Sequence, residues 1–508
     1  MFISKILITT EPTENTERLI HPALLIALNL CNYSRLGDRM FFQRIFNPGL
    51  AINSYLIGDE KTKRCAVIDP SRHVVPFIVQ AQNAGLDITD ILETHVHADY
   101  VSGARELKHQ LNEKPRIYCS GFGGKKWIPS YADVVVNSKT IVKFGEIRLE
   151  PLHTPGHTPE HIIWVCYDES RSSRIPWFAF TGDCLLVGSI GRPDLLGEKE
   201  LPQLASQLYY TIFEVLAPLP DFLEIHPGHG EGSLCGKSVK QRATSTLGYE
   251  RLFNSYLQQC PLEEWIKKIS KEHLPIPPYF HHLKKKNLEG PSLLGTLKSE
   301  LLSSNKKAPS LNKLFLLDIR HPEVFAAGHI KGAINIPLSN TFCHWAGWML
   351  PFKQPIGLIV ENTHVHAEII DQLRLMGFDQ KISVIHMKED HRLDCDISSF
   401  PMIDVEELAK QNTKTKSLYI LDVRTPEEWL GGHIPGSSHL ELIHFADRLK
   451  NLPDNKTIAL LCKSGQRASL AASLLQKNGF TSVMNIRGGM QAWKQAGLPL
   501  ESSKRKKH

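Results

Sequence analysis

The residues of this chain that could do chemistry gather in four short segments carrying histidine or aspartate beside glycine or proline. The first segment is THVHADY, in which His95, His97 and Asp99 alternate with other residues. One histidine of this kind usually caps a turn or sits satisfied in a core. Four such segments, each expected at the end of a strand, instead predict a metal site built from imidazole nitrogens and carboxylate oxygens. The other three segments are TPGHT with His157, FTGD with Asp183 and HPGHG with His229.

The order of these segments resembles the metallo-β-lactamase superfamily, which includes glyoxalase II and implies an αββα sandwich. The resemblance covers about half of the chain. In the two-metal members a histidine follows the aspartate of the first motif and helps to hold the second metal, whereas Tyr100 stands there in this chain. A neutral phenol, with a reference pKa of about 10, is a poor ligand for a hard divalent ion. The tyrosine therefore indicates a mononuclear centre.

Two imidazoles and one carboxylate around one metal suit a non-haem Fe(II) oxygenase and equally a catalytic zinc site, and the residues alone do not separate the two. The segments THVHADYVSG, TPGHTPEH, FTGDCLLVGSIGRPDL and HPGHGEGSLCGK resemble the persulfide dioxygenase branch of the superfamily, which uses mononuclear iron. This resemblance implies one Fe(II) per chain, with zinc as the alternative. The spacing of His97 would also let that side chain face the metal. The implied ligands are His95, His157 and Asp183, and the implied neighbours, which orient ligands or hydrogen-bond the substrate, are His97, Asp99 and His229.

Two further residues near these motifs are candidates for the same site. Arg192 follows the metal loop in GSIGRPD, where the dioxygenases use an arginine to hold the anionic groups of the thiol carrier; a surface arginine is the alternative. Cys235 lies just after the last metal motif in GEGSLCGK. We consider it a candidate relay or regulatory thiol, with an ordinary buried cysteine as the alternative.

A second kind of chemistry is indicated near the C-terminus by KTIALLCKSGQRASLAASLL. A buried strand is expected to end at Cys462, a tight loop of four residues follows, and Arg467 opens an apolar-faced helix. Backbone N–H groups and a helix N-terminus around a sulfur stabilise a thiolate and its persulfide. The segment resembles the rhodanese family, which the neighbouring LDVR, GGHIPG and RGGMQAW support, and Cys462 and Arg467 are its implied catalytic residues.

The rhodanese-like segment has a second copy upstream in the chain. LDIRHPEVFAAGHIKGAINIP begins at Leu317, and LDVRTPEEWLGGHIPGSSHL begins at Leu421. In the first copy, Val360 or Glu361 stands where the second has its cysteine, so this copy has no nucleophile and is expected to be a spacer or docking surface. Cys343 lies elsewhere in the first copy and is expected to be a buried thiol.

The elements that position these residues define an α/β multidomain chain. Short strands such as CAVIDP and ITDILETH alternate with the metal-motif loops, and a segment rich in proline and lysine separates them from the two copies. The expected fold is an αββα metallo-β-lactamase sandwich followed by two α/β rhodanese-like domains. The expected units are an N-terminal extension at 1–39, the metal domain at 40–275, a linker at 276–290, the degenerate rhodanese-like domain at 291–390, the active one at 398–501 and a basic tail at 502–508.

Composition excludes several classes of protein. An apolar content of 42%, a charged content of 22% and a net charge of +6 describe a globular chain, and no basic patch with a nucleic-acid-binding module is present. Ten cysteines occur without a CxxC pair, which favours a reducing, cytoplasmic setting. The apolar run from Leu19 to Leu30 is too short to span a bilayer and contains Pro22, so no membrane partner is expected.

These features favour a bifunctional enzyme of sulfide detoxification. The iron domain would oxidise the persulfide of a small thiol, of the glutathione or coenzyme A type, with O₂ to sulfite, and the rhodanese would pass sulfur through Cys462, including onto sulfite to give thiosulfate. The alternatives are a zinc thioester hydrolase of the glyoxalase II type with a rhodanese appendage, and a sulfur-carrier or sensing protein. The sequence leaves open the thiol, the direction of the rhodanese step and whether the chain is a homo-oligomer.

Overall fold

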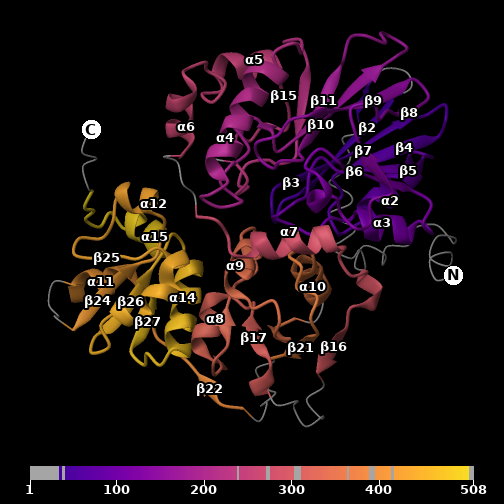
Figure 1. Ribbon diagram of the computed structural model, residues 1–508. Helices are drawn as coiled ribbons and strands as arrows, with labels where there is room; N and C mark the ends of the chain where they lie inside the picture. Colours follow the sequence, from indigo (N-terminus) through magenta and orange to yellow (C-terminus); the bar gives the residue numbers. More distant parts are fainter. Residues whose placement is uncertain are drawn as a thin grey trace, which may run out of the picture.

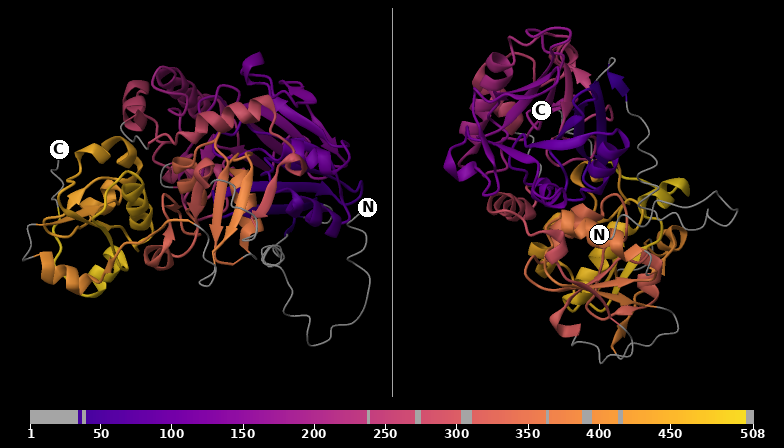
Figure 2. Two further views of the ribbon diagram at one scale, coloured as in Figure 1. Left: turned by 90° about the horizontal axis from the view of Figure 1, so that it is seen from below. Right: turned by 90° about the vertical axis from the view of Figure 1, so that its right-hand side faces the viewer.

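The computed structural model describes residues 34–36, 40–236, 239–270, 275–302, 311–362, 365–387, 395–412 and 417–502. The predicted extension at 1–39 lies outside the described residues except for one short strand, and the predicted basic tail lies outside them except for its first residue. Three domains follow one another along the chain, and the third lies at one end of the molecule, beside the second (Figures 1 and 2).

The first domain contains two facing β-sheets. The strands of the seven-stranded sheet are, in order, β1 (Ser34–Leu36), β2 (Met40–Asn47), β3 (Ile52–Asp59), β4 (Arg64–Ile68), β5 (Asp87–Leu92), β6 (Arg116–Ser120) and β7 (Val134–Val136). The strands of the six-stranded sheet are, in order, β15 (Ser245–Thr246), β14 (Glu224–Pro227), β11 (Phe178–Gly182), β10 (Ile162–Asp168), β9 (Ile147–His153) and β8 (Val142–Phe144). A separate hairpin pairs β12 (Leu185–Leu186) with β13 (Ser189–Ile190).

Alternation along the strands explains the layered packing. In β10, Ile162 and Trp164 belong to the apolar cluster between the sheets, whereas Ile163 and Val165 pack on the opposite face. Because successive side chains of a strand point to opposite faces, strands that are apolar at every position are buried on both sides. Helices cover the two outer faces and give the predicted αββα order: α2 (Val75–Asn83) and α3 (Ala104–Gln110) on one sheet, and α4 (Leu201–Tyr210), α5 (Leu247–Phe253) and α6 (Leu262–Ser270) on the other.

The second and third domains have parallel sheets of the same topology, which confirms the predicted duplication. The second domain orders its strands β16 (Ser299–Leu302), β21 (Ile382–His386), β20 (Ile356–Val360), β17 (Phe315–Asp318) and β19 (Ile334–Asn335). The third orders them β23 (Met402–Ile403), β27 (Val483–Ile486), β26 (Thr457–Leu461), β24 (Leu418–Asp422) and β25 (Ser438–His439), and a small sheet pairs β18 (His329–Ile330) with β22 (Ile397–Ser398). Their helices are α8 (Pro322–Ala327), α9 (Phe342–Met349) and α10 (His366–Leu375), then α11 (Val405–Asn412), α12 (Pro426–Leu430), α13 (Phe445–Arg448), α14 (Gln466–Lys477) and α15 (Gly489–Gln495).

The segment predicted as a linker, 276–290, contains helix α7 (Tyr279–Glu289). This helix lies along the boundary between the first domain and helices α9 and α10 of the second (Figure 1). Its side chains Tyr279, Phe280 and Leu283 are almost fully buried and belong to an apolar cluster that also contains residues of the first and second domains. The segment therefore forms part of a packed interface, which its polar composition did not indicate.

Candidate metal centre and sulfur-transfer site

The four metal-motif segments meet at one edge of the sandwich. His95 follows β5, His157 lies in the turn between β9 and β10, Asp183 directly follows β11, and His229 follows β14. The side chains of His95, His157 and Asp183 are buried, and one ligand atom from each lies within 4.8 Å of the others. The tertiary structure thus brings together the three residues that the sequence predicts as metal ligands.

Hydrogen bonds orient the two imidazole rings of this group. The Thr94 hydroxyl donates to Asp69 (2.8 Å) and therefore accepts from Nδ1–H of His95 (2.9 Å). Nδ1 of His157 lies 3.1 Å from the carbonyl oxygen of Arg192 and donates to it, because a carbonyl can only accept. Both rings consequently keep Nε2 as the free nitrogen, which is the arrangement in which a neighbouring acceptor fixes the tautomer of a metal-binding histidine.

Asp183 supplies the negative charge of the group. Its Oδ2 lies 3.4 Å from Nε2 of His157, and neither carboxylate oxygen accepts an N–H or O–H hydrogen bond from the described residues. Burial alone would raise the pKa of Asp183, but the charges of His229 and His157 prevail and lower it. Burial lowers the pKa of His95, which favours the neutral ring. A carboxylate whose oxygens accept no N–H or O–H hydrogen bond from the described residues, beside two imidazole rings with Nε2 free, fits a divalent cation.

Glycines allow the loops to approach this carboxylate. A Cβ atom at Gly191 would lie 1.9 Å from the carbonyl oxygen of Asp183, and one at Gly228 would lie 2.8 Å from its Oδ1. Any larger residue at either position would displace the aspartate. Gly191 and Gly228 are therefore required by close packing around the metal group.

His97 points away from this group. Its Nε2 lies 3.2 Å from Asp69, 3.1 Å from Glu93 and 3.0 Å from the hydroxyl of Tyr100. Burial opposes protonation, but the two carboxylates outweigh it and raise the pKa of His97 well above its usual value. His97 thus forms a buried ion-pair cluster behind His95, and the Tyr100 hydroxyl belongs to that cluster.

A second group lies beside the first. Asp99, His229 and Cys235 are buried with ligand atoms within 4.8 Å of one another. His229 Nε2 lies 3.3 Å from Asp99 Oδ2 and 3.5 Å from Oδ2 of Asp183, so Asp183 stands between the two groups. Burial, followed by the charges of Asp99 and Asp183, raises the pKa of the Cys235 thiol well above its usual value. Tyr100 is not a member of this group, and the thiol of Cys235 provides the third donor.

Arg192 is buried beside the metal group. Its guanidinium donates to both oxygens of Asp194 (2.9 and 2.6 Å) and to the carbonyl oxygen of Leu234 (3.3 Å). Its backbone N–H donates to the carbonyl oxygen of Cys235 (3.2 Å). Arg192 therefore ties the loop after Asp183 to the loop of Cys235, and its predicted contact with a substrate anion stays a prediction.

Asn287 is a residue of this site that sequence reasoning missed. From α7 its amide donates to the carbonyl oxygens of His97 (2.7 Å) and Tyr100 (2.8 Å), and its Oδ1 accepts from the N–H of Ser102 (3.0 Å). Its side chain is 1% exposed. Asn287 lies far along the chain from the first metal motif, in a segment whose composition resembles a linker, so no local pattern could have identified it.

The cysteine predicted for sulfur transfer directly follows a buried strand. Cys462 follows β26, is 1% exposed, and accepts a hydrogen bond at Sγ from the N–H of Gly465 (3.0 Å). Gly465 has φ +99° and caps the N-terminus of α14, so the loop needs glycine there. The RGGMQAW segment holds the loop from behind: the N–H of Met490 donates to the carbonyl oxygen of Cys462 (2.8 Å), and a Cβ at Gly489 would lie 2.4 Å from that oxygen.

Arg467 lies at the start of the same helix. Its guanidinium makes two hydrogen bonds to the carboxylate of Glu428, at 2.7 and 2.8 Å. Glu428 belongs to a capping box with Thr425 at the start of α12. Because Glu428 compensates the arginine charge, the N–H of Gly465 and the N-terminus of α14 provide the nearest stabilisation of a sulfur anion.

The described residues of the first copy lack this arrangement. Its strand β20 ends at Val360, and Glu361 follows where the second copy has its cysteine. Cys343 lies in α9, is fully buried, and burial raises the pKa of its thiol to about 12. A thiol that stays protonated is not a nucleophile, which agrees with its expected role as a buried thiol.

Comparison with known families and proteins supports the same division of the chain. The model of the metallo-beta-lactamase superfamily matches residues 47–234, and that of the rhodanese-like domain matches residues 299–385 and 404–496. The mitochondrial persulfide dioxygenase ETHE1 of Mus musculus is 28% identical over 49% of this chain and 87% of its own length. A sulfurtransferase of Allochromatium vinosum is 34% identical over 19% of this chain and 92% of its own length.

A solved structure extends this similarity across the domain boundary. The crystal structure of a metallo-beta-lactamase from Staphylococcus aureus subsp. aureus COL is 34% identical, with a TM-score of 0.62, and is matched over 69% of this chain and 100% of its own. Within the described part of the chain, no helix combines the length and apolar character that a membrane crossing requires.

Proposed function

Since this chain belongs to the metallo-β-lactamase superfamily through its first domain and to the rhodanese-like family through the two that follow, we propose that it is an iron-dependent persulfide dioxygenase joined to a sulfurtransferase. The substrate would be the persulfide of a small thiol of the glutathione or coenzyme A type. The overall oxidation converts RSSH, O₂ and H₂O into RSH and sulfurous acid, which ionises to sulfite.

The observation that carries this proposal is the convergence of His95, His157 and Asp183 in one buried group. Two neutral imidazoles and one carboxylate leave coordination positions open, as in Fe(II) oxygenases. These three residues would hold the iron, which would supply the activation of O₂. The chain's own contribution is to orient the two rings through Thr94 and the Arg192 carbonyl oxygen.

The residues of the second group would position the persulfide. Asp99, His229 and Cys235 form a separate group beside the proposed iron ligands, with Nε2 of His229 3.5 Å from Oδ2 of Asp183. Nδ1 of His229 lies 3.3 Å from the carbonyl oxygen of Ala51 and donates to it, so Nε2 remains as the nitrogen that could accept a hydrogen bond from the persulfide S–H. The surrounding core excludes water, which strengthens such polar contacts.

In the third domain, Cys462 would receive and release the outer sulfur of a persulfide. Its thiolate attacks that sulfur, and the bond to the donor thiol breaks with its electron pair. The new persulfide would be stabilised by the Gly465 N–H and the α14 N-terminus. Attack by sulfite would then form thiosulfate and restore the thiolate. Joining both centres in one chain keeps sulfite and persulfide at a high local concentration.

The second candidate function is a two-metal thioester hydrolase of the glyoxalase II type. The group of Asp99, His229 and Cys235 favours it, because these residues could hold a second ion beside the first. Metal content measured together with O₂ uptake distinguishes the two functions. About one iron per chain with sulfite production supports the dioxygenase, whereas two zinc ions with thioester hydrolysis and no O₂ uptake would overturn it.

A pair of histidine variants sharpens this experiment. His157→Ala should lose both iron and O₂ uptake, because each of few ligands is costly to remove. His153→Ala is the matched control, since His153 lies near the same strand end but hydrogen-bonds the carbonyl oxygen of Pro159 instead. Equal iron retention in both variants would refute the assigned ligands.

A further inference from the structure

A cavity opens beside Cys462, and both rhodanese-like copies form its wall. Its volume is about 250 Å³. The third domain contributes Cys462 and the loop that follows it, and the second domain contributes Ile336, Ser339, Thr341 and Trp345. The copy without a nucleophile thus provides one side of the site that surrounds the nucleophile of the other copy.

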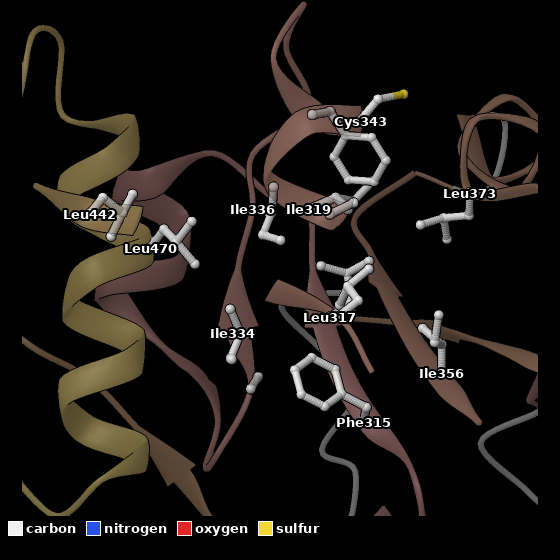
Figure 3. Close-up of a cluster of buried hydrophobic side chains, with 14 of the residues drawn as sticks. Phe315, Leu317, Ile319, Ile334, Ile336, Cys343, Ile356, Leu373, Leu442 and Leu470 are labelled. Carbon is white, nitrogen blue, oxygen red and sulfur yellow. The ribbon is translucent and has the colours of Figure 1, made fainter. Parts of the chain in front are cut away.

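The position of this wall is fixed by a buried interface. The N–H of Asn335 donates to the hydroxyl of Ser473 (3.1 Å), and the hydroxyl of Ser469 donates to Oδ1 of Asn335 (2.6 Å). Figure 3 shows Leu470 of α14 beside Ile336 of the second domain, in one apolar cluster. Satisfied buried hydrogen bonds within an apolar contact specify one relative placement of the two domains. The cavity is therefore part of the folded chain.

The chemistry of the wall indicates what the cavity accepts. Ile336 and the half-buried ring of Trp345 form an apolar side, and the hydroxyls of Ser339 and Thr341 lie within hydrogen-bond distance of each other (3.2 Å). Across from them lie the exposed Lys463 and the N-terminus of α14, which favour negative charge. The site combines a surface for carbon atoms with groups that bind an anion.

The cavity is larger than a purely inorganic ligand would fill. A cavity of about 150 Å³ already holds a benzene ring, and this one has about 250 Å³. Cyanide or sulfite would leave the Trp345 side unfilled. A thiol on a carbon skeleton that carries a carboxylate or phosphate would contact both sides.

We infer that the first rhodanese-like copy is the specificity wall of the sulfur-transfer site and that this site exchanges sulfur with a small, anionic organic thiol. The inference rests on the sulfur-transfer half of the proposed function. The organic thiolate attacks the outer, protonated sulfur of the Cys462 persulfide. A bond forms between those two sulfurs, the bond to Sγ breaks, and Cys462 leaves as the thiolate. The products are RSSH and the free enzyme, and the reverse exchange loads Cys462.

The test compares two acceptors after Cys462 has been loaded from thiosulfate. Glutathione has a carbon skeleton and negative charge, whereas cyanide is too small to contact Trp345. Trp345→Ala should lower kcat/KM for glutathione about tenfold, mainly through KM, and lower that for cyanide less than about threefold. Trp348→Ala, on the same helix but outside the cavity wall, is the matched control and should change neither. An equal loss with both acceptors, or no loss with glutathione, would overturn the inference.

A second variant keeps the test decisive if Trp345→Ala misfolds. Ser339 is only half-buried, so the Ser339→Glu protein should fold. The new negative charge should raise KM for glutathione about five- to tenfold, while KM for neutral 2-mercaptoethanol should stay within about twofold of its value in the unmodified protein. Equal effects on both thiols would contradict an anion site. If the unmodified protein transfers no sulfur even to cyanide, the sulfur-transfer proposal itself fails, and the inference falls with it.

Discussion

The hydrogen bonds between Asn287 and the first metal motif support a prediction that the metal site depends on helix α7, which lies outside the predicted metal domain. Asn287 belongs to α7, outside the predicted metal domain, yet it makes three hydrogen bonds to the loop that carries His95. We predict that Asn287→Ala loosens this loop and weakens metal binding. The residue would act by positioning, since it does not belong to the ligand group.

The magnitude follows from the groups left behind. Removal of the amide strips the partners from the carbonyl oxygens of His97 and Tyr100 and from the N–H of Ser102. A buried polar group without a partner costs about 1–3 kcal/mol, and partial relaxation of the loop lowers the sum, so we expect a loss of about 3–5 kcal/mol. That is a large part of the stability of an ordinary domain, about 5–15 kcal/mol. Iron affinity should fall by about 10–100-fold, as for other groups that hold a metal ligand in place.

The assay combines urea-induced unfolding, followed by tryptophan fluorescence, with competition for iron by a chelator. Lys285→Ala is the matched control on the same helix, because Lys285 is 72% exposed and pairs only loosely with Glu289, at 3.7 Å. A surface pair of this kind contributes at most about 1 kcal/mol. If Asn287→Ala unfolds within about 1 kcal/mol of the unmodified protein and holds iron equally well, the reasoning is refuted.

Three further predictions concern single side chains. Cys462→Ser should abolish thiosulfate-linked sulfur transfer while O₂ uptake continues and sulfite accumulates, whereas Cys343→Ser should transfer sulfur normally. Parallel assays of O₂, sulfite and thiosulfate measure these effects. Loss of O₂ uptake in an iron-loaded Cys462→Ser protein would contradict two separate centres. Tyr100→Phe should leave iron content unchanged and lower stability by about 1–2 kcal/mol, because it removes only a hydroxyl bonded to His97, and denaturation with metal analysis measures both. Cys235→Ser should prevent the thiolate-to-metal ultraviolet absorption expected when Cd²⁺ enters the second group, and an unchanged spectrum would show that Cys235 is no ligand.

Much of the architecture could be predicted from local sequence patterns. Strand-length apolar runs that end in histidine, aspartate or cysteine indicated where reactive groups would stand, and the family comparisons confirm the sandwich and the two rhodanese-like copies. The conformation of the loop from Cys462 to Arg467 could also be predicted, because a strand, a glycine-containing turn and a helix follow one another within a few residues. These features depend on contacts between near neighbours in the chain, which local composition and spacing describe directly.

Only the tertiary structure decided how the side chains combine. The spacing of His97 allowed it to face the metal, but burial beside Asp69 and Glu93 turns its Nε2 toward those carboxylates. Tyr100 indicated a mononuclear centre; the structure groups Cys235 with Asp99 and His229 beside the first group, and the number of metal ions stays a prediction. Asp69 and Cys235 come from loops other than the one that carries His97 and Asp99, and their distances to it are set by the packing of the two sheets.

The role of the degenerate copy was likewise invisible in its own sequence. The lack of a cysteine after β20 predicts that this copy has no nucleophile and serves as a spacer or docking surface, but it does not indicate which of its residues face the neighbouring copy. Trp345 reaches the Cys462 cavity only because hydrogen bonds and apolar contacts fix α14 against β19. The sequence by itself therefore determined the elements and the reactive residue types. The long-range packing of those elements, in which desolvation and complementary shape select one arrangement, decided which residues share a site.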